Sequence, residues 1–241
     1  MNFQDTQLIG VLARAESTVS SLSSLLGGLV EKFAARGYSL YLVGGSVRDA
    51  LLGRLGNDLD FTTPARPEVV KEILDEWAET VWDTGIDFGT VSAAYKGQQI
   101  EITTFRSDSY DGQSRNPEVV YGDTLEGDLV RRDFKANAMA IELLADASFK
   151  FHDPLHGLQD IADRVLDTPD KPEISFHDDP LRMLRAARFA SQLEFRVADR
   201  VVEAMRDMAG EIQRITVERV QVELDKLICG TAPWDGIDLL V

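Results

Sequence analysis

The sequence predicts an α+β protein in which a mixed α/β first part is followed by a helical second part. Three observations predict this organisation. Short β-rich runs alternate with helical runs up to about residue 105, the pattern beyond Asp128 is mostly helical, and a proline-containing break lies at Pro169–Pro172. A chain of 241 residues is long enough for one large or two small domains. We therefore expect domains at residues 1–170 and 171–241.

The expected elements of the first part follow from local patterns. Residues 1–36 have helical spacing, with a serine-rich break at Ser17–Ser24 and a stop at Gly37. The next four elements are bounded by glycine, proline or polar residues: a strand at Ser39–Val43, a helix at Ser46–Leu52, a strand at Asp58–Thr62 and a helix at Pro67–Trp77.

Two further β-rich runs, Gly89–Tyr95 and Gln99–Phe105, flank Lys96-Gly97, a pair typical of hairpin turns. The polar stretch Arg106–Gly127 predicts a long flexible loop of the kind that often has a function. In the second part, helical spacing is found at Asp178–Gln192, Ala198–Met208 and Thr216–Ile228. Because the chain stops at the apolar GIDLLV, we expect a fragment of a longer protein.

Composition excludes several classes of function. The net charge of −16 argues against a protein that coats nucleic acid by bulk electrostatics, so any such contact needs local basic patches or metal ions. One cysteine and three histidines favour neither a disulfide framework nor a structural zinc site. No apolar run reaches membrane-spanning length and no basic N-terminal region is present. We expect a cytoplasmic protein without a membrane partner or an evident obligate protein partner.

One stretch, LYLVGGSVRDALLGRLGNDLDFTT at residues 40–63, predicts a site for a nucleoside triphosphate. Asp58 and Asp60 point to the same face of a strand, where their repulsion favours a hard cation such as Mg²⁺. Gly44 and Gly45 allow the backbone to approach an anion, and the helix start at Ser46 offers free amide groups to it.

Simpler interpretations exist for the same residues. Ser46 and Asp49 have the spacing of a capping box that needs no ligand. Arg48 could form a surface ion pair of little energetic value. An isolated Asp-x-Asp is common, whereas the order of strand, Gly-Gly-Ser, helix and strand with Asp-x-Asp is far more specific.

These residues form the first of several ordered blocks that carry a resemblance to a known family. The later blocks are IEITTFR (100–106), DLVRRDFKANAMA (128–140), DDPLRMLRAARFASQLEF (178–195) and RITVERVQVELDKLI (214–228). Together they resemble the polymerase-β-type nucleotidyltransferases, in the branch containing bacterial tRNA CCA-adding enzymes and poly(A) polymerases. The resemblance spans roughly Leu25 to Ile228. It implies a polymerase-β-like catalytic head, with a small mixed sheet and flanking helices, and a helical neck.

The resemblance implies roles for residues of the head. Two Mg²⁺ ions would be held by Asp58 and Asp60, with Glu101 as a third carboxylate; an exposed strand glutamate is the equal alternative for Glu101. The triphosphate would be bound by Gly44, Gly45, Ser46, Arg48 and Arg132. Asp133 and Asn137 would lie near the ribose, where an acceptor can test for a 2′-hydroxyl. The family usually has Thr where this chain has Lys135.

The resemblance also implies a protein template for the incoming base. Cytosine and adenine both present an amine beside a ring-nitrogen acceptor, which suits the carboxylate of Asp179 and the guanidinium of Arg182. Arg182, Arg185 and Arg188 recur every third position as a basic strip for triphosphate or primer, with a solvated helix face as the alternative. Asp178-Asp179-Pro180 could also be an ordinary helix opening, and Asp178 stands where the family normally has Glu.

The expected function is addition of C, C and A to the tRNA 3′ end from CTP and ATP. Val81–Tyr95 and the loop Arg106–Asp123 resemble the CCA-adding version of the family. Alternatives are a nucleotidyltransferase with another acceptor, including a poly(A) polymerase, and a nucleotide-binding module without catalysis. A phosphohydrolase of the HD type, suggested by His152-Asp153 and His177-Asp178, lacks the additional spaced His and Asp residues.

Overall fold

The computed structural model of the protein describes residues 3–108 and 119–241. Internal contacts divide them into two compact units. The first unit contains the chain up to Arg132 together with Asn137–Leu155, and the second contains Asp133–Ala136 together with His156–Val241. The expected boundary near residue 170 lies inside the second unit, and the division at 170 stays a prediction. None of the helices in the described ranges has the length and apolarity needed to span a bilayer.

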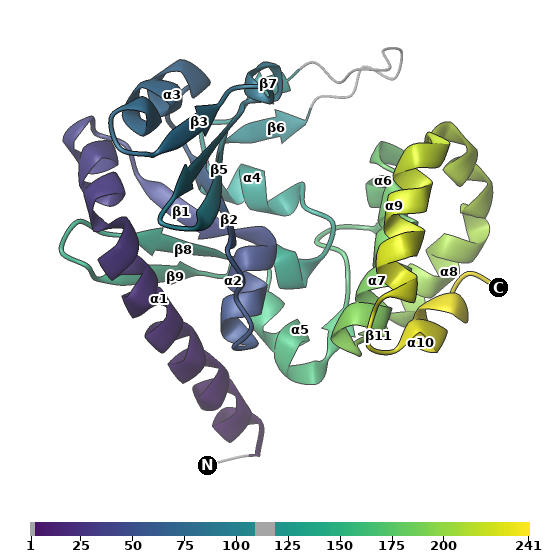
Figure 1. The fold of residues 1–241 in the computed structure, drawn as a ribbon. Helices are drawn as coiled ribbons and strands as arrows, with labels where there is room; N and C mark the ends of the chain where they lie inside the picture. The colour runs from purple at the N-terminus through teal and green to yellow at the C-terminus, as the bar shows by residue number, and fades with distance from the viewer. Residues whose placement is uncertain (1–2, 109–118) are drawn as a thin grey trace. The chain divides into compact units, whose positions relative to one another are not determined.

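The first unit is a mixed sheet with helices packed on it (Figure 1). Its helices are α1 (Phe3–Ala35), α2 (Gly44–Leu51), α3 (Pro67–Asp75) and α4 (Leu125–Val130), with a 3₁₀ turn η1 (Ile86–Phe88). Its strands are β1 (Leu40–Val43), β2 (Asp58–Thr63), β3 (Thr80–Trp82), β4 (Thr90–Tyr95), β5 (Gln98–Thr104), β6 (Arg106–Asp108), β7 (Val119–Tyr121), β8 (Ala140–Leu143) and β9 (Phe149–His152).

Among the described residues, seven strands form one sheet in the order β3-β4-β5-β2-β1-β8-β9. Within it β2 and β5 pair in parallel, and all other neighbours are antiparallel. The remaining strands β6 and β7 form a separate antiparallel pair. The strand β2 therefore occupies the centre of the sheet.

The two faces of this sheet differ in character because side chains alternate along each strand. Leu59 and Phe61 of β2 are buried on one face with apolar residues of neighbouring strands: Leu42, Val91, Ile100, Ile102 and Ile141. The helices α1 and α3 contact each other and pack on this side (Figure 1). Asp58 and Asp60 point to the opposite face and are exposed.

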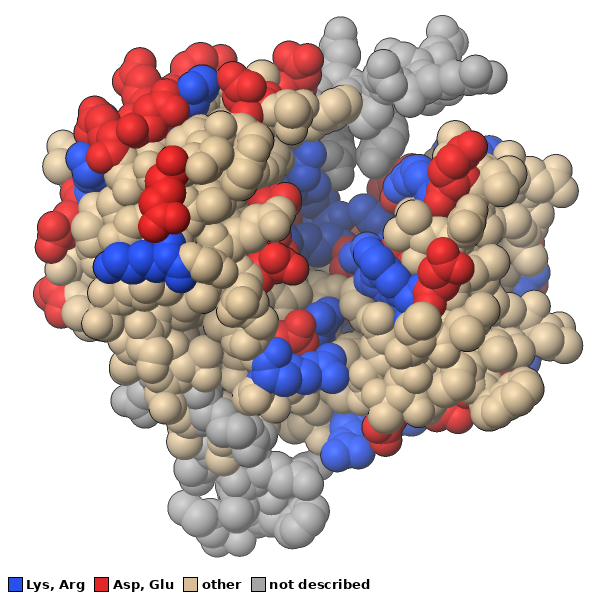
Figure 2. Space-filling view, in the orientation of Figure 1, with Lys and Arg blue, Asp and Glu red and all other residues tan. Residues whose placement is uncertain are grey.

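Acidic side chains gather over α3 and the residues that follow it (Figure 2). The exposed members of this group are Glu68, Glu72, Asp75, Glu76 and Glu79. Because α3 packs on the apolar side of the sheet, part of the net charge of −16 lies on the side opposite to Asp58 and Asp60.

The second unit is mostly helical. Its helices are α5 (Gly157–Asp163), α6 (Pro172–Asp178), α7 (Leu181–Leu193), α8 (Asp199–Asp207), α9 (Val217–Ile228) and α10 (Pro233–Ile237), with a 3₁₀ segment η3 (Ala209–Arg214); a further 3₁₀ turn, η2, spans Lys135–Asn137. The strands β10 (Val165–Leu166) and β11 (Arg196–Val197) form a short parallel pair. Helix α7 packs against α9 and α10 and forms the centre of this unit. The predicted fold class is confirmed, with β10 and β11 as additions to the helical part.

The predicted break at Ser17–Ser24 is wrong, because α1 is continuous from Phe3 to Ala35. The hydroxyl of Ser21 donates to the carbonyl oxygen of Ser17 one turn earlier, so this serine satisfies its hydrogen bond inside the helix. Val19 and Leu26 are fully buried, and their packing outweighs the low helix propensity of serine.

Beyond Asp128 the chain is mostly helical, as expected, but β8 and β9 were not expected and complete the sheet of the first unit. Arg106–Gly127 is not a single loop: β6 and β7 occupy its ends and α4 begins at Leu125, while residues 109–118 lie outside the described residues. The short strand β3 was not expected. The hairpin at Lys96-Gly97 is confirmed, with φ of 48° and 77° at its two turn residues.

The helix expected at Asp178–Gln192 is α7, which begins three residues later than expected, and an additional helix, α6, precedes it. Helix α6 ends at Asp178 and α7 begins at Leu181, so Asp179-Pro180 forms the junction. Proline has no N–H to donate to a preceding turn, which ends α6 before it.

Candidate active site

Helix α2 begins at Gly44, where the backbone has a conformation that only glycine adopts without strain. Gly44 has φ of +66°, in the left-handed region, and a Cβ there would lie 2.9 Å from Nη1 of Arg132. The N-cap residue Val43 makes no side-chain capping bond. Because of this geometry, the first amide groups of α2 have no side-chain cap, and a helix N-terminus of this kind favours an anion.

Ser46 connects this helix to the strand of the aspartates. Its hydroxyl accepts a hydrogen bond from the Asp60 backbone N–H at 2.9 Å and donates to the Asp58 carbonyl oxygen at 3.3 Å. The capping-box interpretation with Asp49 is therefore wrong for Ser46. The side chain is buried and aligns α2 with β2, and binding of the triphosphate by Ser46 stays a prediction.

Three carboxylates share the exposed face of the sheet. Asp58 and Asp60 are two residues apart on β2, and Glu101 of β5 is the direct register partner of Asp60. The pKa of the Asp60 carboxyl is raised, first by its partial removal from water and then by the nearby Glu101 and Asp58 carboxylates. Arg132 and Arg48 oppose this shift without cancelling it. The structure thus brings together the three residues expected at the catalytic centre, and their catalytic roles stay predictions.

This donor set fits Mg²⁺ better than a metal held by protein alone. Among the described residues, no group of three or more His, Cys, Asp or Glu side chains is arranged to enclose a metal ion. Mg²⁺ usually takes one or two carboxylates and completes its shell with water and substrate phosphates. Besides burial, repulsion from Glu101 and Asp58 raises the pKa of Asp60, and a divalent cation would relieve this repulsion, so Asp58 and Asp60 suit such an ion.

Arg132 is held beside Gly44 by a buried aspartate that sequence reasoning missed. The Asp128 side chain is fully buried and accepts from Nη2 of Arg132 and Nη2 of Arg131, each at 2.9 Å. Burial alone would raise the pKa of Asp128, but the two guanidinium groups hold it below its ordinary value. The sequence contained a signal for this pairing, because on a helix an acid pairs with basic residues three and four positions later, and Asp128 stands at those distances from Arg131 and Arg132.

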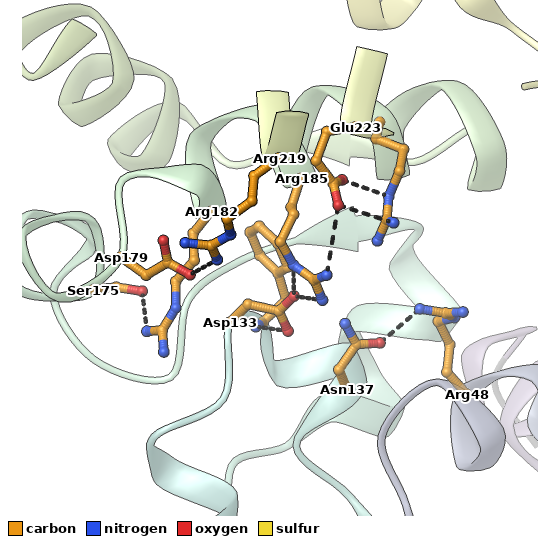
Figure 3. A network of polar contacts seen from close by, with 11 residues as sticks. Arg48, Asp133, Asn137, Ser175, Asp179, Arg182, Arg185, Arg219 and Glu223 are labelled. Carbon is orange, nitrogen blue, oxygen red and sulfur yellow. Dashed lines mark hydrogen bonds and ion pairs between the residues drawn. The ribbon is translucent and has the colours of Figure 1, made fainter. Parts of the chain in front are cut away.

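Arg48 is part of the interior of the first unit. Its Nη1 donates to Oδ1 of Asn137 at 2.7 Å (Figure 3). Its Nη2 pairs with Asp49 at 2.9 Å. With an exposed fraction of 7%, Arg48 does not form the surface ion pair that the simpler interpretation required. Arg48 links α2 to the segment that carries Asn137.

In the second unit, Asp133 is bound to α7. One of its carboxylate oxygens accepts from Nε of Arg185 at 2.8 Å and also from Nη2 of the same guanidinium (Figure 3). Its other oxygen accepts from the Phe134 N–H at 2.9 Å. The carboxylate is therefore fixed in orientation, which suits a group that must test for a hydroxyl.

The two expected template residues are both held by neighbours in the second unit. Oδ1 of Asp179 accepts from the Leu181 N–H at 3.2 Å, so the helix-opening interpretation holds for this oxygen. Oδ2 accepts from Arg219 at 3.1 Å (Figure 3). Arg182 donates from Nη1 to the hydroxyl of Ser175 at 2.8 Å. A role in base recognition stays a prediction for both.

The basic strip of α7 is not a solvated face. Arg188 is buried and pairs through Nε with Oε2 of Glu223 at 3.1 Å, with its guanidinium 4.2 Å from the ring centroid of Phe189. Sequence reasoning missed Glu223. The available signal was its position in the apolar stripe of α9, three residues after Val220 and four before Leu227.

The two His-Asp pairs behind the phosphohydrolase alternative belong to different units. His152 belongs to the first unit, where its Nε2 lies 3.3 Å from Glu142, and His177 belongs to the second.

Two protein families match the sequence. The family described as the poly A polymerase head domain matches residues 40–167, more than half of the chain. A family described as a probable RNA- and SrmB-binding site of polymerase A matches residues 194–241.

Curated relatives of high similarity are CCA-adding enzymes. The enzyme of Listeria innocua is 41% identical over 214 residues, which are 88% of this chain and 52% of the relative. The enzyme of Enterococcus faecalis is 38% identical over 210 residues, 87% of this chain and 50% of the relative. The chain spans about half the length of these relatives.

Solved structures give the same result. The Bacillus stearothermophilus CCA-adding enzyme in complex with CTP has a TM-score of 0.78 and 36% identity, over 90% of this chain and 51% of that one. A tRNA nucleotidyltransferase complexed with a primer tRNA and an incoming ATP analogue has a TM-score of 0.71 and 27% identity, over 92% and 59%. The fold, the ordered motifs and these matches together show that the chain belongs to the poly A polymerase head domain family.

Proposed function

We propose that this chain is the catalytic part of a tRNA nucleotidyltransferase that adds C, C and A to the tRNA 3′ end. The substrates would be CTP, ATP and a tRNA lacking part or all of its CCA end, and the second product would be pyrophosphate. The observation that supports this most strongly is the group of Asp58, Asp60 and Glu101 on one sheet face, in a chain about 40% identical to CCA-adding enzymes.

In the first unit, the α2 N-terminus at Gly44 and Gly45 would bind phosphate oxygens through backbone N–H groups. Arg132, oriented by Asp128, would add positive charge beside them. Asp58 and Asp60 would hold two Mg²⁺ ions, which when bound activate the primer 3′-hydroxyl and neutralise the leaving pyrophosphate. Glu101 would add a third carboxylate to the same face.

In the second unit, Asp179 and Arg182 would recognise the base. The carboxylate accepts from the exocyclic amine of cytosine or adenine, and the guanidinium donates to the ring nitrogen beside it. Uracil presents a carbonyl to the carboxylate and an N–H to the guanidinium, so both contacts become repulsive. Asp133 would accept from the ribose 2′-hydroxyl. The proposal includes a cytoplasmic location, which suits a chain whose single cysteine, Cys229, is free and exposed.

The test supplies CTP, ATP and UTP separately to tRNAs that end at the discriminator base, at C and at CC. The proposal expects C on the first two acceptors, A on the third, and no U on any of them. A generic RNA and a tRNA with a complete CCA end serve as controls. Long A tracts on generic RNA would favour a poly(A) polymerase instead, and equal use of UTP would contradict the roles of Asp179 and Arg182.

A further inference from the structure

A four-residue segment, Asp133–Ala136, belongs to the second unit although the chain on both sides of it belongs to the first. Its side chains make the contacts that tie it there. Asp133 binds Arg185 of α7, and Phe134 is fully buried with its ring 5.8 Å from that of Phe189 in an edge-to-face arrangement. These two contacts fix one side of the segment on α7.

Lys135 fixes the other side of the segment, on the residues that follow β10. Its Nζ donates to Oδ2 of Asp167 at 2.7 Å, and its backbone N–H donates to the carbonyl oxygen of the same residue at 2.9 Å. The Lys135 side chain is 24% exposed and that of Asp167 only 15%. A doubled contact of this kind, partly withdrawn from water, orients the backbone as well as the side chain.

Asp167 is itself held in place. Its Oδ1 accepts from Nε of Arg200 at 2.7 Å and from the Thr168 N–H at 3.0 Å. Arg200 of α8 also donates to the carbonyl oxygens of Thr168 and Asp170. Lys135 is thus joined to a carboxylate whose other oxygen is already bound, so the position of Asp167 does not depend on Lys135 alone.

We propose that Lys135, through Asp167, positions Asp133 for recognition of the nucleotide ribose, and that it is a specificity-determining residue of this chain. This inference rests on the proposed function. Asp133 is two residues from Lys135, on the same short segment, and its carboxylate is useful only if its orientation is fixed to a fraction of an ångström. A threonine at this position would carry no charge to pair with Asp167, so the side-chain half of the anchor depends on the lysine.

The experiment measures binding of CTP and dCTP to the 241-residue chain by calorimetric titration in the presence of Mg²⁺, without tRNA. The variants are Lys135→Thr, Lys135→Met and Lys135→Arg. The matched control is Arg200→Met, which removes the other cation bound to Asp167 and leaves Asp133–Ala136 untouched. Thermal unfolding of every variant measures the accompanying loss of stability.

We expect the preference for CTP over dCTP to fall roughly fivefold to tenfold in Lys135→Thr and Lys135→Met, because a misplaced acceptor no longer distinguishes the 2′-hydroxyl. Lys135→Arg should retain most of the preference. Arg200→Met should also retain most of it, even if it unfolds at a lower temperature, because Asp167 keeps its contacts with Lys135 and the Thr168 N–H. An unchanged preference in Lys135→Thr would overturn the inference, as would an equal loss in Arg200→Met.

The same titration separates this inference from the proposed function. If the unmodified chain binds neither nucleotide, the proposed function fails and the inference fails with it. If the unmodified chain prefers CTP and the Lys135 variants keep that preference, the inference alone fails.

Discussion

Two groups of acidic residues, one in each unit, have opposite surroundings. On the sheet face of the first unit, burial and the nearby Glu101 and Asp58 carboxylates together raise the pKa of Asp60. In the second unit, Glu223 of α9 is paired with the buried Arg188 of α7. This pair joins helices α7 and α9.

This difference distinguishes acids that are ready for a ligand from acids that maintain the fold. Carboxylates that repel one another cost stability, and such an arrangement is retained where a cation or substrate relieves it. Carboxylates paired with buried arginines are needed by the fold, because removing one partner leaves an uncompensated charge. The following predictions test this distinction.

The largest effect is expected for Asp58→Asn and Asp60→Asn. Nucleotide incorporation into tRNA should fall by about 10³-fold or more, since each change removes a proposed metal ligand. The folded state should be as stable as before or more stable, because the repulsion at Asp60 decreases. Incorporation of labelled CTP and thermal unfolding measure the two effects, with the exposed Asp83→Asn as control. Normal activity in either variant would contradict a catalytic role for Asp58 and Asp60.

In the second unit, Glu223→Gln should instead lower the stability of the folded state. Arg188 is then left buried without its counter-charge, and the free energy of unfolding should decrease by about 3 kcal/mol. The control is Glu211→Gln, which breaks an exposed ion pair with Arg214 and should change stability by less than about 0.5 kcal/mol. Denaturant unfolding measures both. Equal losses of stability in the two variants would mean that burial of the Arg188–Glu223 pair does not increase its contribution to stability.

Gly44→Ala tests the backbone at the start of α2. Alanine at a positive φ should cost about 1 kcal/mol of stability, and the approach of its Cβ to Arg132 should add about 1 kcal/mol. The matched control is Gly37→Ala, where φ is +79° and nothing lies within 4 Å of the added Cβ. Denaturant unfolding should therefore rank Gly44→Ala as the more damaging change, and the reverse ranking would contradict the contact with Arg132.

The smallest effect is a dependence of stability on pH that comes from Asp128. Its pKa in the folded state is below the ordinary value of 3.8, because Arg131 and Arg132 outweigh the effect of burial. A lowered pKa contributes stability above 3.8 that is lost as the pH falls through the folded value. Asp128→Asn should flatten this part of the stability curve, measured by thermal unfolding between pH 5 and the acid limit of folding. An unaltered acid slope would exclude Asp128 as its source.

Sequence reasoning succeeded where the signal was local. The hairpin at Lys96-Gly97 and the common face of Asp58 and Asp60 depend on neighbours in the chain, and both are as expected. It failed where the partner is distant in sequence. The strand β8 joins the sheet by pairing with β1, about 100 residues earlier in the chain, and β9 then pairs with β8. The pairs Arg188–Glu223 and Lys135–Asp167 likewise join segments more than 30 residues apart.

The central position of β2 has a consequence for the motions of the protein. Amide hydrogens exchange with solvent mainly through local opening, which begins at the ends and edges of a sheet and reaches its middle last. With three strands of the described sheet on either side of β2, the amides of Leu59 and Phe61 should be among the slowest to exchange in the first unit. Local opening of the edge strands β3 and β9 therefore leaves Asp58 and Asp60 in place and does not change the distance between them.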